Sequence, residues 1–155
     1  MLTFDEAKHE YRWDGVRIPS VSEILASTLY AGRMDAIDPW YAQRGTCFHA
    51  AIALDHEDKL DEDSLDDSIV GFFKAYKLFK NETKFKAKTW EQRFYVAEWP
   101  YCGTYDAEDG FAVYDFKTGS RHWWHDIQVN AYMTPLGLVH GKLVYVKEDG
   151  TYKVT

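Results

Sequence analysis

Two aspartates and a lysine stand in an alternating stretch, "GTYDAEDGFAVYDFKTG", at residues 103–119. Asp115 and Lys117 are two positions apart, and side chains at that spacing in a β-strand point to the same face. Asp106 precedes them, separated by an Asp-Gly pair that favours a two-residue hairpin turn. The stretch therefore predicts a hairpin that brings two carboxylates and an ammonium group to one face.

The expected turn also sets the register of this hairpin. With Asp109 and Gly110 in the turn, Asp106 pairs with Val113 and lies diagonal to Asp115, at roughly 7 Å between the Cβ atoms. The opposite face of the hairpin then points to the core. The residues expected there are Tyr105, Ala107, Ala112, Tyr114 and Phe116.

Two carboxylates held this close on a half-buried sheet repel each other, so either one stays protonated or a cation joins them. Carboxylate oxygens suit a hard cation, and Lys117 would lie beside it. A lysine in that place could accept a proton from an attacking water, or could orient the water and stabilise charge on a phosphate. The alternative is an exposed strand face on which Asp115 and Lys117 form an ordinary ion pair.

Turn and capping residues divide the rest of the chain into the elements that must position these groups. An N-terminal hairpin is expected before Pro19, and Ser20 with Glu23 forms a capping box at the start of a helix. Further helices are expected over about Pro39 to Leu54, with Gly45 as a weak point, and over about Leu65 to Lys80, with an acidic loop between them.

From Lys88 the apolar period changes to two, which is typical of strands. The expected strands are "KTWEQRFYVAEW", "CGTYDAE", "FAVYDFK" and, after another helix, "KLVYVKE" and "TYKVT". Three strands, a helix and more strands predict an α/β (α+β) fold with a central mixed sheet flanked by helices. A chain of 155 residues can bury one core, so we expect a single domain over residues 1–155, with residues 1–38 as an elaboration.

Composition excludes several classes of protein. With 46% hydrophobic and 17% aromatic residues the chain is too apolar to be disordered. No apolar run reaches the roughly 20 residues that span a bilayer, and the acidic N-terminus is unlike a signal peptide, so we expect a cytoplasmic protein without a membrane partner. Cys47 and Cys102 lie far apart, which predicts neither a zinc ribbon nor an iron–sulfur cluster.

The net charge of −7 is unevenly distributed. Residues Asp55 to Asp67 carry eight carboxylates against one lysine, whereas Lys74 to Arg93 carry six lysines and an arginine against Glu82 and Glu91. The basic segment could meet phosphates, or both segments could be solvated faces around a helix.

Five segments, in order, resemble motifs of the PD-(D/E)XK nucleases, in particular their RecB-like and phage exonuclease branch. These segments are "RGTCFH", "WEQRFYV", "GTYD", "DFKTG" and "QVNAY". The resemblance spans about Ser20 to Tyr132 and implies a restriction-endonuclease-like core. Relatives that carry an iron–sulfur cluster need four cysteines, and this chain has two, so that cofactor is not expected.

The resemblance also implies a role for each matching residue. Asp106 and Asp115 would bind Mg²⁺ or Mn²⁺ together with the main-chain carbonyl of Phe116 and with His49, and an imidazole ligand suits Mn²⁺ better. Lys117 would be catalytic. From the residues alone, His49 could equally be a core histidine on a helix.

Three further residues match the same motifs. Glu91 could bind a second metal ion or an ordered water, or could be an exposed strand carboxylate. Gln128 and Tyr132 are four apart and share a helical face, so both could reach the metal site, or both could serve ordinary packing.

Phosphate contacts are expected from basic and aromatic residues around the site. Arg44 could hold a phosphate by a forked contact or pair with an acidic neighbour. The segment "HWWH" lacks cysteine partners for zinc, which favours aromatic packing or base stacking by Trp123 or Trp124. The expected nucleic-acid-binding residues are Arg44, Lys84, Lys86, Lys88, Arg121 and Trp124.

The resemblance implies a metal-dependent deoxyribonuclease that hydrolyses phosphodiester bonds and leaves 5′-phosphates. We expect an exonuclease acting at DNA ends or single-stranded regions, in phage-type recombination or DNA degradation, with an oligomer or a recombination protein as a further partner. The alternatives are an endonuclease selective for branched DNA or RNA, and a catalytically silent nucleic-acid-binding module. An intact set of Asp106, Asp115 and Lys117 argues against the silent module.

Overall fold

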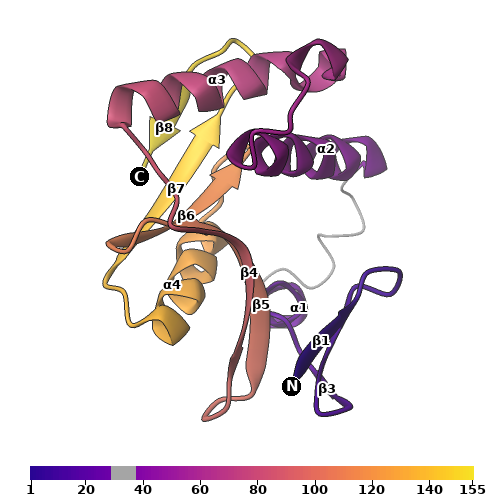
Figure 1. Cartoon of the computed structure of the whole chain (residues 1–155). Helices are drawn as coiled ribbons and strands as arrows, with labels where there is room; N and C mark the ends of the chain where they lie inside the picture. The colour runs from indigo at the N-terminus through magenta and orange to yellow at the C-terminus, as the bar shows by residue number, and fades with distance from the viewer. Residues whose placement is uncertain (29–37) are drawn as a thin grey trace.

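The structure is a computed structural model that describes residues 1–28 and 38–155. Figure 1 shows the elements in space. In chain order they are β1 (Leu2–Asp5), β2 (Glu10–Trp13), β3 (Val16–Ile18), α1 (Val21–Thr28), α2 (Pro39–His56), the short 3₁₀ helix η2 (Glu62–Ser64), α3 (Asp67–Thr83), β4 (Thr89–Val96), β5 (Tyr101–Glu108), β6 (Ala112–Lys117), α4 (Trp124–Leu136), β7 (His140–Val146) and β8 (Tyr152–Val154).

The main sheet has the order β4-β5-β6-β7-β8, and its neighbours are antiparallel except for the parallel pair β6 and β7. Parallel neighbours need a crossover connection, and α4 supplies it. The predicted α/β class with a mixed sheet and flanking helices is confirmed. All five strands expected after residue 88 are present, with ends that differ by a few residues.

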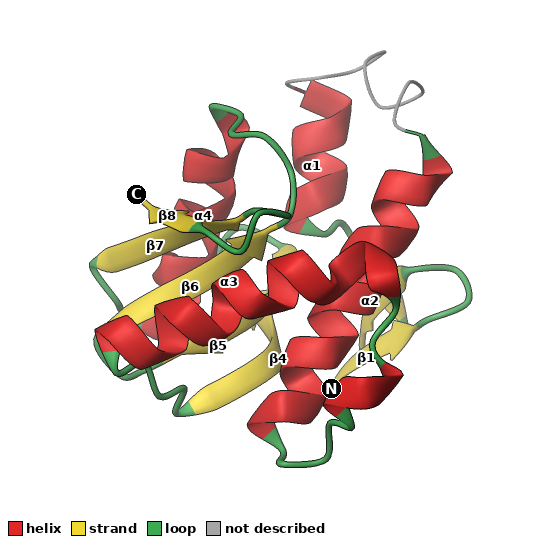
Figure 2. Ribbon diagram, turned by 90° about the horizontal axis from the view of Figure 1, so that it is seen from above, coloured by secondary structure: helices red, strands yellow, loops and turns green. Residues whose placement is uncertain are grey.

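Helices cover both faces of this sheet (Figure 2). On one face α2 and α3 pack on a core rich in aromatic rings, including Phe48, Tyr76, Phe79 and Phe116. On the other face α1 and α4 pack on a second core. The face that carries Asp115 is therefore covered by helices, so its polar groups lie in a protected environment.

The face assignment of the hairpin is correct except for one residue. Ala107, Ala112, Tyr114 and Phe116 lie in the core beneath α2 and α3, as predicted. Tyr105 lies instead in the core beneath α1 and α4, and its hydroxyl is 2.9 Å from Thr89 Oγ1. Strand β5 therefore changes the face of its side chains between residues 105 and 107, at Asp106.

The predicted two-residue turn is wrong. Glu108 pairs with Val113, so residues 109–112 form a four-residue connection and the register shifts by two positions. The side chain of Asp109 explains the difference, because its Oδ1 accepts the amides of Phe111 and Ala112 and its Oδ2 accepts the hydroxyl of Tyr114. A shift of two residues preserves which face each side chain occupies.

The N-terminal hairpin is extended by a third strand into a sheet β1-β2-β3, which lies beside the β4–β5 hairpin (Figure 1). Trp13 stacks on Tyr95 at 4.4 Å between ring centroids, and Tyr11 shares a hydrogen bond with Thr104. The predicted capping box of α1 is present: Ser20 Oγ accepts the Glu23 amide, and a Glu23 carboxylate oxygen accepts the Ser20 amide. Residues 29–37 of the predicted elaboration lie outside the described residues.

Helices α2 and α3 lie where the sequence predicted them, with ends that differ by a few residues. Gly45 does not interrupt α2, which runs to His56. Helix α3 starts at Asp67 rather than near Leu65, because the Asp66 side chain caps it by accepting the Ser68 amide. In the two ranges that the structure describes, no helix combines the length and the apolar character needed to cross a membrane.

Two helical glycines offer a matched test of this packing. A Cβ at Gly71 in α3 would lie 1.8 Å from the backbone oxygen of Glu148, so Gly71→Ala must displace the turn after β7. A Cβ at Gly45 would meet only Thr118 Oγ1 at 3.9 Å, so Gly45→Ala in α2 gains helix propensity without a clash. We expect Gly71→Ala to lower the free energy of unfolding by about 2 kcal/mol or more and Gly45→Ala to raise it by about 0.5 kcal/mol. Urea unfolding of both variants measures this, and equal stabilities would contradict the close contact of α3 with this turn.

Candidate active site

The pairing of β5 with β6 ends at Asp106. The paired residues are Ala107 with Tyr114 and Glu108 with Val113, and the next position in this register sets Asp106 opposite Asp115. The two aspartates are therefore opposed rather than diagonal. In place of a ladder hydrogen bond, the Phe116 amide donates to Asp106 Oδ2 at 2.7 Å.

The neighbouring strand is distorted at the same level. In β4, Trp90 pairs with Ala107 and Gln92 with Tyr105, so Glu91 falls opposite Asp106. Glu91 has a φ of 46°, a left-handed conformation that is rare and costly for a non-glycine residue, and its side chain is exposed. Both strands that flank Asp106 thus depart from regular geometry beside it.

Asp115 is almost fully buried, and its nearest cation is Lys117. Asp115 Oδ2 lies 2.8 Å from Lys117 Nζ, but the contact lacks hydrogen-bond geometry, and this buried oxygen accepts no hydrogen bond from the described residues. A buried carboxylate is costly unless it is paired with a cation. The Lys117 ammonium therefore supplies the charge that Asp115 needs at this position.

Helix α4 positions the lysine through two polar side chains one turn apart. Lys117 Nζ donates to Gln128 Oε1 at 2.9 Å, and Gln128 Nε2 donates to the Tyr132 hydroxyl at 2.8 Å. Burial, followed by the carboxylates of Asp115 and Asp106, raises the pKa of Tyr132 well above its ordinary value. The predicted convergence of Gln128 and Tyr132 on the site is thus present in the structure, as a chain of hydrogen bonds that ends at Lys117.

His49 reaches the site from the opposite side, on α2. Its Nδ1 lies 3.6 Å from Asp106 Oδ1, and its side chain is about one third exposed. Asp106 thus lies between an imidazole on α2 and the β6 backbone. His49 is not a core histidine, because it faces a carboxylate at a partly open position.

The charges of this cluster act on Asp106. Burial is the largest influence and raises the pKa of Asp106, and the Asp115 carboxylate raises it further. His49, Lys117 and the Phe116 amide lower it. The net effect is to raise the pKa of Asp106 to about 6. The site therefore resists carrying two negative charges together, which is the condition that a bound cation would relieve.

The donor set fits a hard divalent cation. In a β-strand the N–H and C=O groups of one residue point toward the same neighbouring strand. Because the Phe116 amide donates to Asp106, the Phe116 carbonyl is also directed toward Asp106. Within residues 1–28 and 38–155 no three His, Cys, Asp or Glu side chains lie close enough together to hold one ion. Asp106, Asp115 and the Phe116 carbonyl would hold Mg²⁺ or Mn²⁺ with water completing its shell, as Mg²⁺ commonly prefers, and His49 lies beside them.

Arg44, expected to meet phosphate, is held near the site by the protein itself. Its Nη2 donates to the Thr118 carbonyl at 3.1 Å, and its guanidinium lies over the rings of Trp40, Tyr41 and Phe72. No acidic side chain pairs with it among the described residues, so its contact with phosphate stays a prediction.

The expected phosphate-binding lysines lie to one side of the site. The Lys88 amide donates to the Glu108 carbonyl, which places Lys88 about four residues, or roughly 13 Å, along the sheet from Lys117. Lys84 caps α3 in a left-handed conformation, and Lys86 is exposed. A role for these three lysines in binding DNA stays a prediction.

The acidic segment at the end of α2 and after it contacts two lysines of α3. Lys80 donates to Asp55 at 2.6 Å, and Lys77 donates to Glu62 at 2.7 Å. These two lysines are neutralised by the end of α2 and the loop that follows it, because α2 and α3 pack side by side. They are therefore poor candidates for phosphate contacts.

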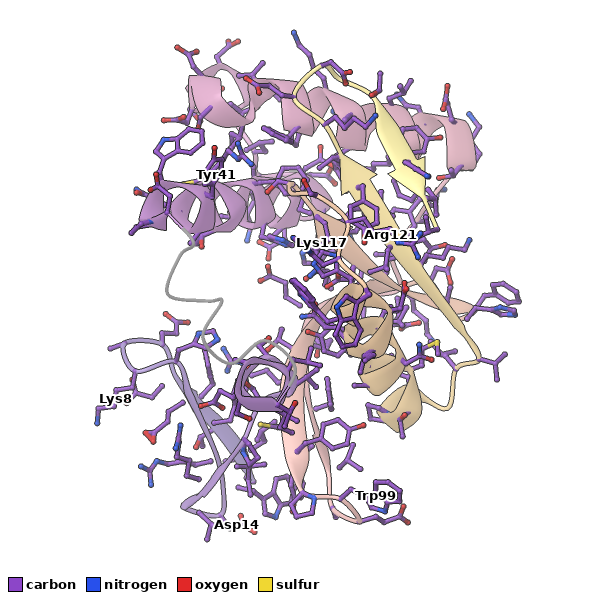
Figure 3. All side chains as sticks on the ribbon, turned by 180° about the vertical axis from the view of Figure 1, so that it is seen from behind. Lys8, Asp14, Tyr41, Trp99, Lys117 and Arg121 are labelled. Carbon is purple, nitrogen blue, oxygen red and sulfur yellow. The ribbon has the colours of Figure 1, made fainter. Side chains whose placement is uncertain are left out.

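The "HWWH" segment spans the start of α4. Its rings pack against one another, as expected for the alternative of aromatic packing. His122 and Trp124 stack at 4.1 Å, and buried His125 shares a 2.9 Å hydrogen bond with the hydroxyl of Tyr145. Arg121 pairs with Asp126 at 3.1 Å at the surface near Lys117 (Figure 3).

Sequence reasoning missed the proximity of His125 to the site. Burial and the Lys117 ammonium lower the pKa of His125 to about 4, so the ring is neutral beside the lysine. Its position three residues before Gln128, on the same face of α4, is a signal in the sequence that could have found it.

No family model matches this chain, and no curated protein is significantly similar to it. The resemblance to PD-(D/E)XK nucleases therefore depends on the quoted motifs and on the geometry described above.

The raised pKa of Asp106 predicts a pH-dependent stability of the metal-free protein. Because the folded pKa of about 6 exceeds the unfolded value of about 4, the protonated carboxyl stabilises the fold below about pH 4, and this contribution is lost as the pH rises through 6. Asp106→Asn removes this titration. In EDTA the variant should exceed the wild type by at most about 3 kcal/mol at pH 8, and the difference should vanish toward pH 4.

Urea unfolding of both proteins between pH 4 and pH 8 measures this difference. Asp63→Asn removes an equal charge from the exposed loop after α2 and controls for net charge. If Asp106→Asn is less stable than the wild type at every pH, the two carboxylates do not oppose each other as described.

Proposed function

We propose that the chain is a divalent-metal-dependent deoxyribonuclease of the PD-(D/E)XK type, which hydrolyses phosphodiester bonds and leaves 5′-phosphates. The observation that carries the proposal is the cluster of Asp106, Asp115 and Lys117 at the point where β5 and β6 separate. An ordinary ion pair lies on a solvated face, whereas the Asp115 carboxylate is almost fully buried. The order of helices, three antiparallel strands, crossover helix and parallel strand agrees with the proposed type.

The residues divide into ligands and positioning groups. Asp106, Asp115 and the Phe116 carbonyl would hold Mg²⁺ or Mn²⁺, with His49 as a further ligand. Glu91 is exposed on β4 at the level of Asp106. When bound, the cation would neutralise the carboxylates, polarise a phosphoryl oxygen and favour the ionised form of a nearby water.

Lys117 is the residue of the chain that we assign to the attacking water. Its ammonium group donates to Gln128, and Tyr132 fixes Gln128, so the lysine is held in one direction before substrate binds. In this arrangement Lys117 orients the water and stabilises the negative charge that develops on the phosphate. Water attacks phosphorus, the bond to the 3′ oxygen breaks, and the proton lost by the water passes to solvent or to the leaving oxygen.

We propose exonuclease action at DNA ends or single-stranded regions, in phage-type recombination or DNA degradation within a cytoplasm, with an oligomer or a recombination protein as a further partner. No helix-turn-helix occurs among the described elements, which favours recognition of ends or structure over recognition of base sequence. The rival with the same chemistry is an endonuclease for branched DNA or for RNA.

Replacement of the lysine tests the catalytic assignment. We expect Lys117→Ala to lower the single-turnover cleavage rate about 10²- to 10⁴-fold, because a positioned acid–base or electrostatic group is lost. Lys153→Ala, an exposed lysine on edge strand β8 of the same sheet, is the matched control and should cleave at the wild-type rate. Circular dichroism in Mn²⁺ verifies that both variants are folded. Near-normal cleavage by Lys117→Ala would show that Lys117 is an ordinary ion-pair partner of Asp115.

A comparison of substrates tests the function itself. End-labelled linear DNA and closed circular DNA are incubated side by side with Mn²⁺, and again with EDTA. We expect loss of the linear DNA from its ends, no cut in the circle, and no cleavage in EDTA. Nicking of the circular DNA would show that the protein is an endonuclease rather than an exonuclease. If the protein binds DNA but leaves both substrates intact, it is a catalytically silent module.

A further inference from the structure

A groove with a volume of about 900 Å³ adjoins the candidate active site. Its walls come from α2, α3, the loop after β6 and the end of β7. Thr118 lines the groove and directly follows Lys117 in the chain, so the groove borders the candidate active site. Figure 3 shows Tyr41 on α2 on one side of Lys117 and Arg121 on the other.

One cation is fixed in the wall of the groove. Arg44 donates through Nη2 to the Thr118 carbonyl, and three rings lie 4.5 to 5.0 Å from its guanidinium carbon. Its Nε is buried and donates to no described residue. The protein sets the position of the guanidinium, so little side-chain entropy is lost when an anion meets the N–H groups that Thr118 does not use.

A second cation and two ring faces complete the lining. Lys147 is exposed and forms no ion pair with a described residue. Tyr41 is 54% exposed, and His122 is exposed with one face stacked on Trp124. Each ring therefore offers surface to a planar ligand, within a groove that also carries positive charge.

The groove also carries two acidic residues, as many as its cations. Asp38 caps α2, and its Oδ1 accepts the Trp40 amide at 2.9 Å, so its charge lies at the positive end of a helix. The backbone of Glu148 approaches Gly71 of α3 closely. Arg44 and Lys147 line the same groove as the rings of Tyr41, Phe72 and His122.

We propose that this groove binds an unpaired DNA strand of a few nucleotides adjoining the reacting phosphate, with bases on Tyr41 and His122 and phosphates at Arg44 and Lys147. The proposal rests on the nuclease function above and specifies its substrate. Rings and cations together in one groove are the features that hold single strands without reading their sequence. A duplex keeps its bases stacked inside, so the ring faces would have no partner along it.

Binding of short oligonucleotides tests the groove without cleavage. A fluorescein-labelled oligo(dT) single strand and a duplex of equal length are titrated with the full chain in EDTA, and fluorescence anisotropy gives each Kd. The groove variant is the double substitution Tyr41→Ala and Lys147→Ala. Its matched control is Trp99→Ala with Lys153→Ala, an exposed aromatic residue and an exposed lysine away from the groove.

We expect the wild type to bind the single strand more tightly than the duplex, and the groove variant to bind the single strand at least about tenfold more weakly. The control should bind like the wild type, and melting temperatures show that all proteins are folded. Equal Kd values for groove variant and wild type, or tighter binding of the duplex, would overturn the proposal.

Cleavage of linear DNA by the wild type is measured in parallel, so the two proposals fail separately. If the wild type cleaves DNA and the groove variant binds the single strand as tightly as the wild type, only the groove proposal is contradicted. If the groove variant binds more weakly and the wild type does not cleave DNA, only the nuclease proposal is contradicted.

Discussion

The repulsion between Asp106 and Asp115 is the constraint around which this structure is organised. Burial, and then the opposed carboxylate of Asp115, raise the pKa of Asp106, and the protein keeps the two carboxylates together by surrounding them with donors. The Phe116 amide serves Asp106 and the Lys117 ammonium lies beside Asp115. The Asp115 carboxylate is almost fully buried with the Lys117 ammonium as its nearest cation, and a cation shared by the two aspartates would relieve their repulsion.

The elements around the pair fulfil the same constraint. Strand β5 changes the face of its side chains at Asp106, and Glu91 of β4 takes a left-handed conformation at the same level. Helix α2 brings His49 from one side, and α4 brings Gln128 from the other. A strained backbone conformation persists only where the surrounding packing holds it in place. The two cores on the faces of the sheet provide that packing.

The sequence alone predicted the mixed sheet, its helices and the side chains that meet at the site, because alternation and helical spacing determine which face a residue occupies. It failed at the hairpin turn, where the Asp109 side chain replaced the tight turn by a four-residue connection. The shift of two residues turned a diagonal pair of aspartates into an opposed pair without changing the face. The contacts of Arg44 with Thr118, and of Lys80 with Asp55, join elements far apart in the chain, and no local pattern encodes them.

Binding of Mn²⁺ to the metal-free chain, followed by the electron paramagnetic resonance signal of the unbound ion, tests the central claim most directly. The account predicts that the wild-type chain removes at least one equivalent of Mn²⁺ from solution at pH 8. A chain with Asp106→Asn and Asp115→Asn together should remove none at the same concentration. Equal uptake by the two proteins, or no uptake by the wild type, would contradict the claim that these two aspartates share a cation.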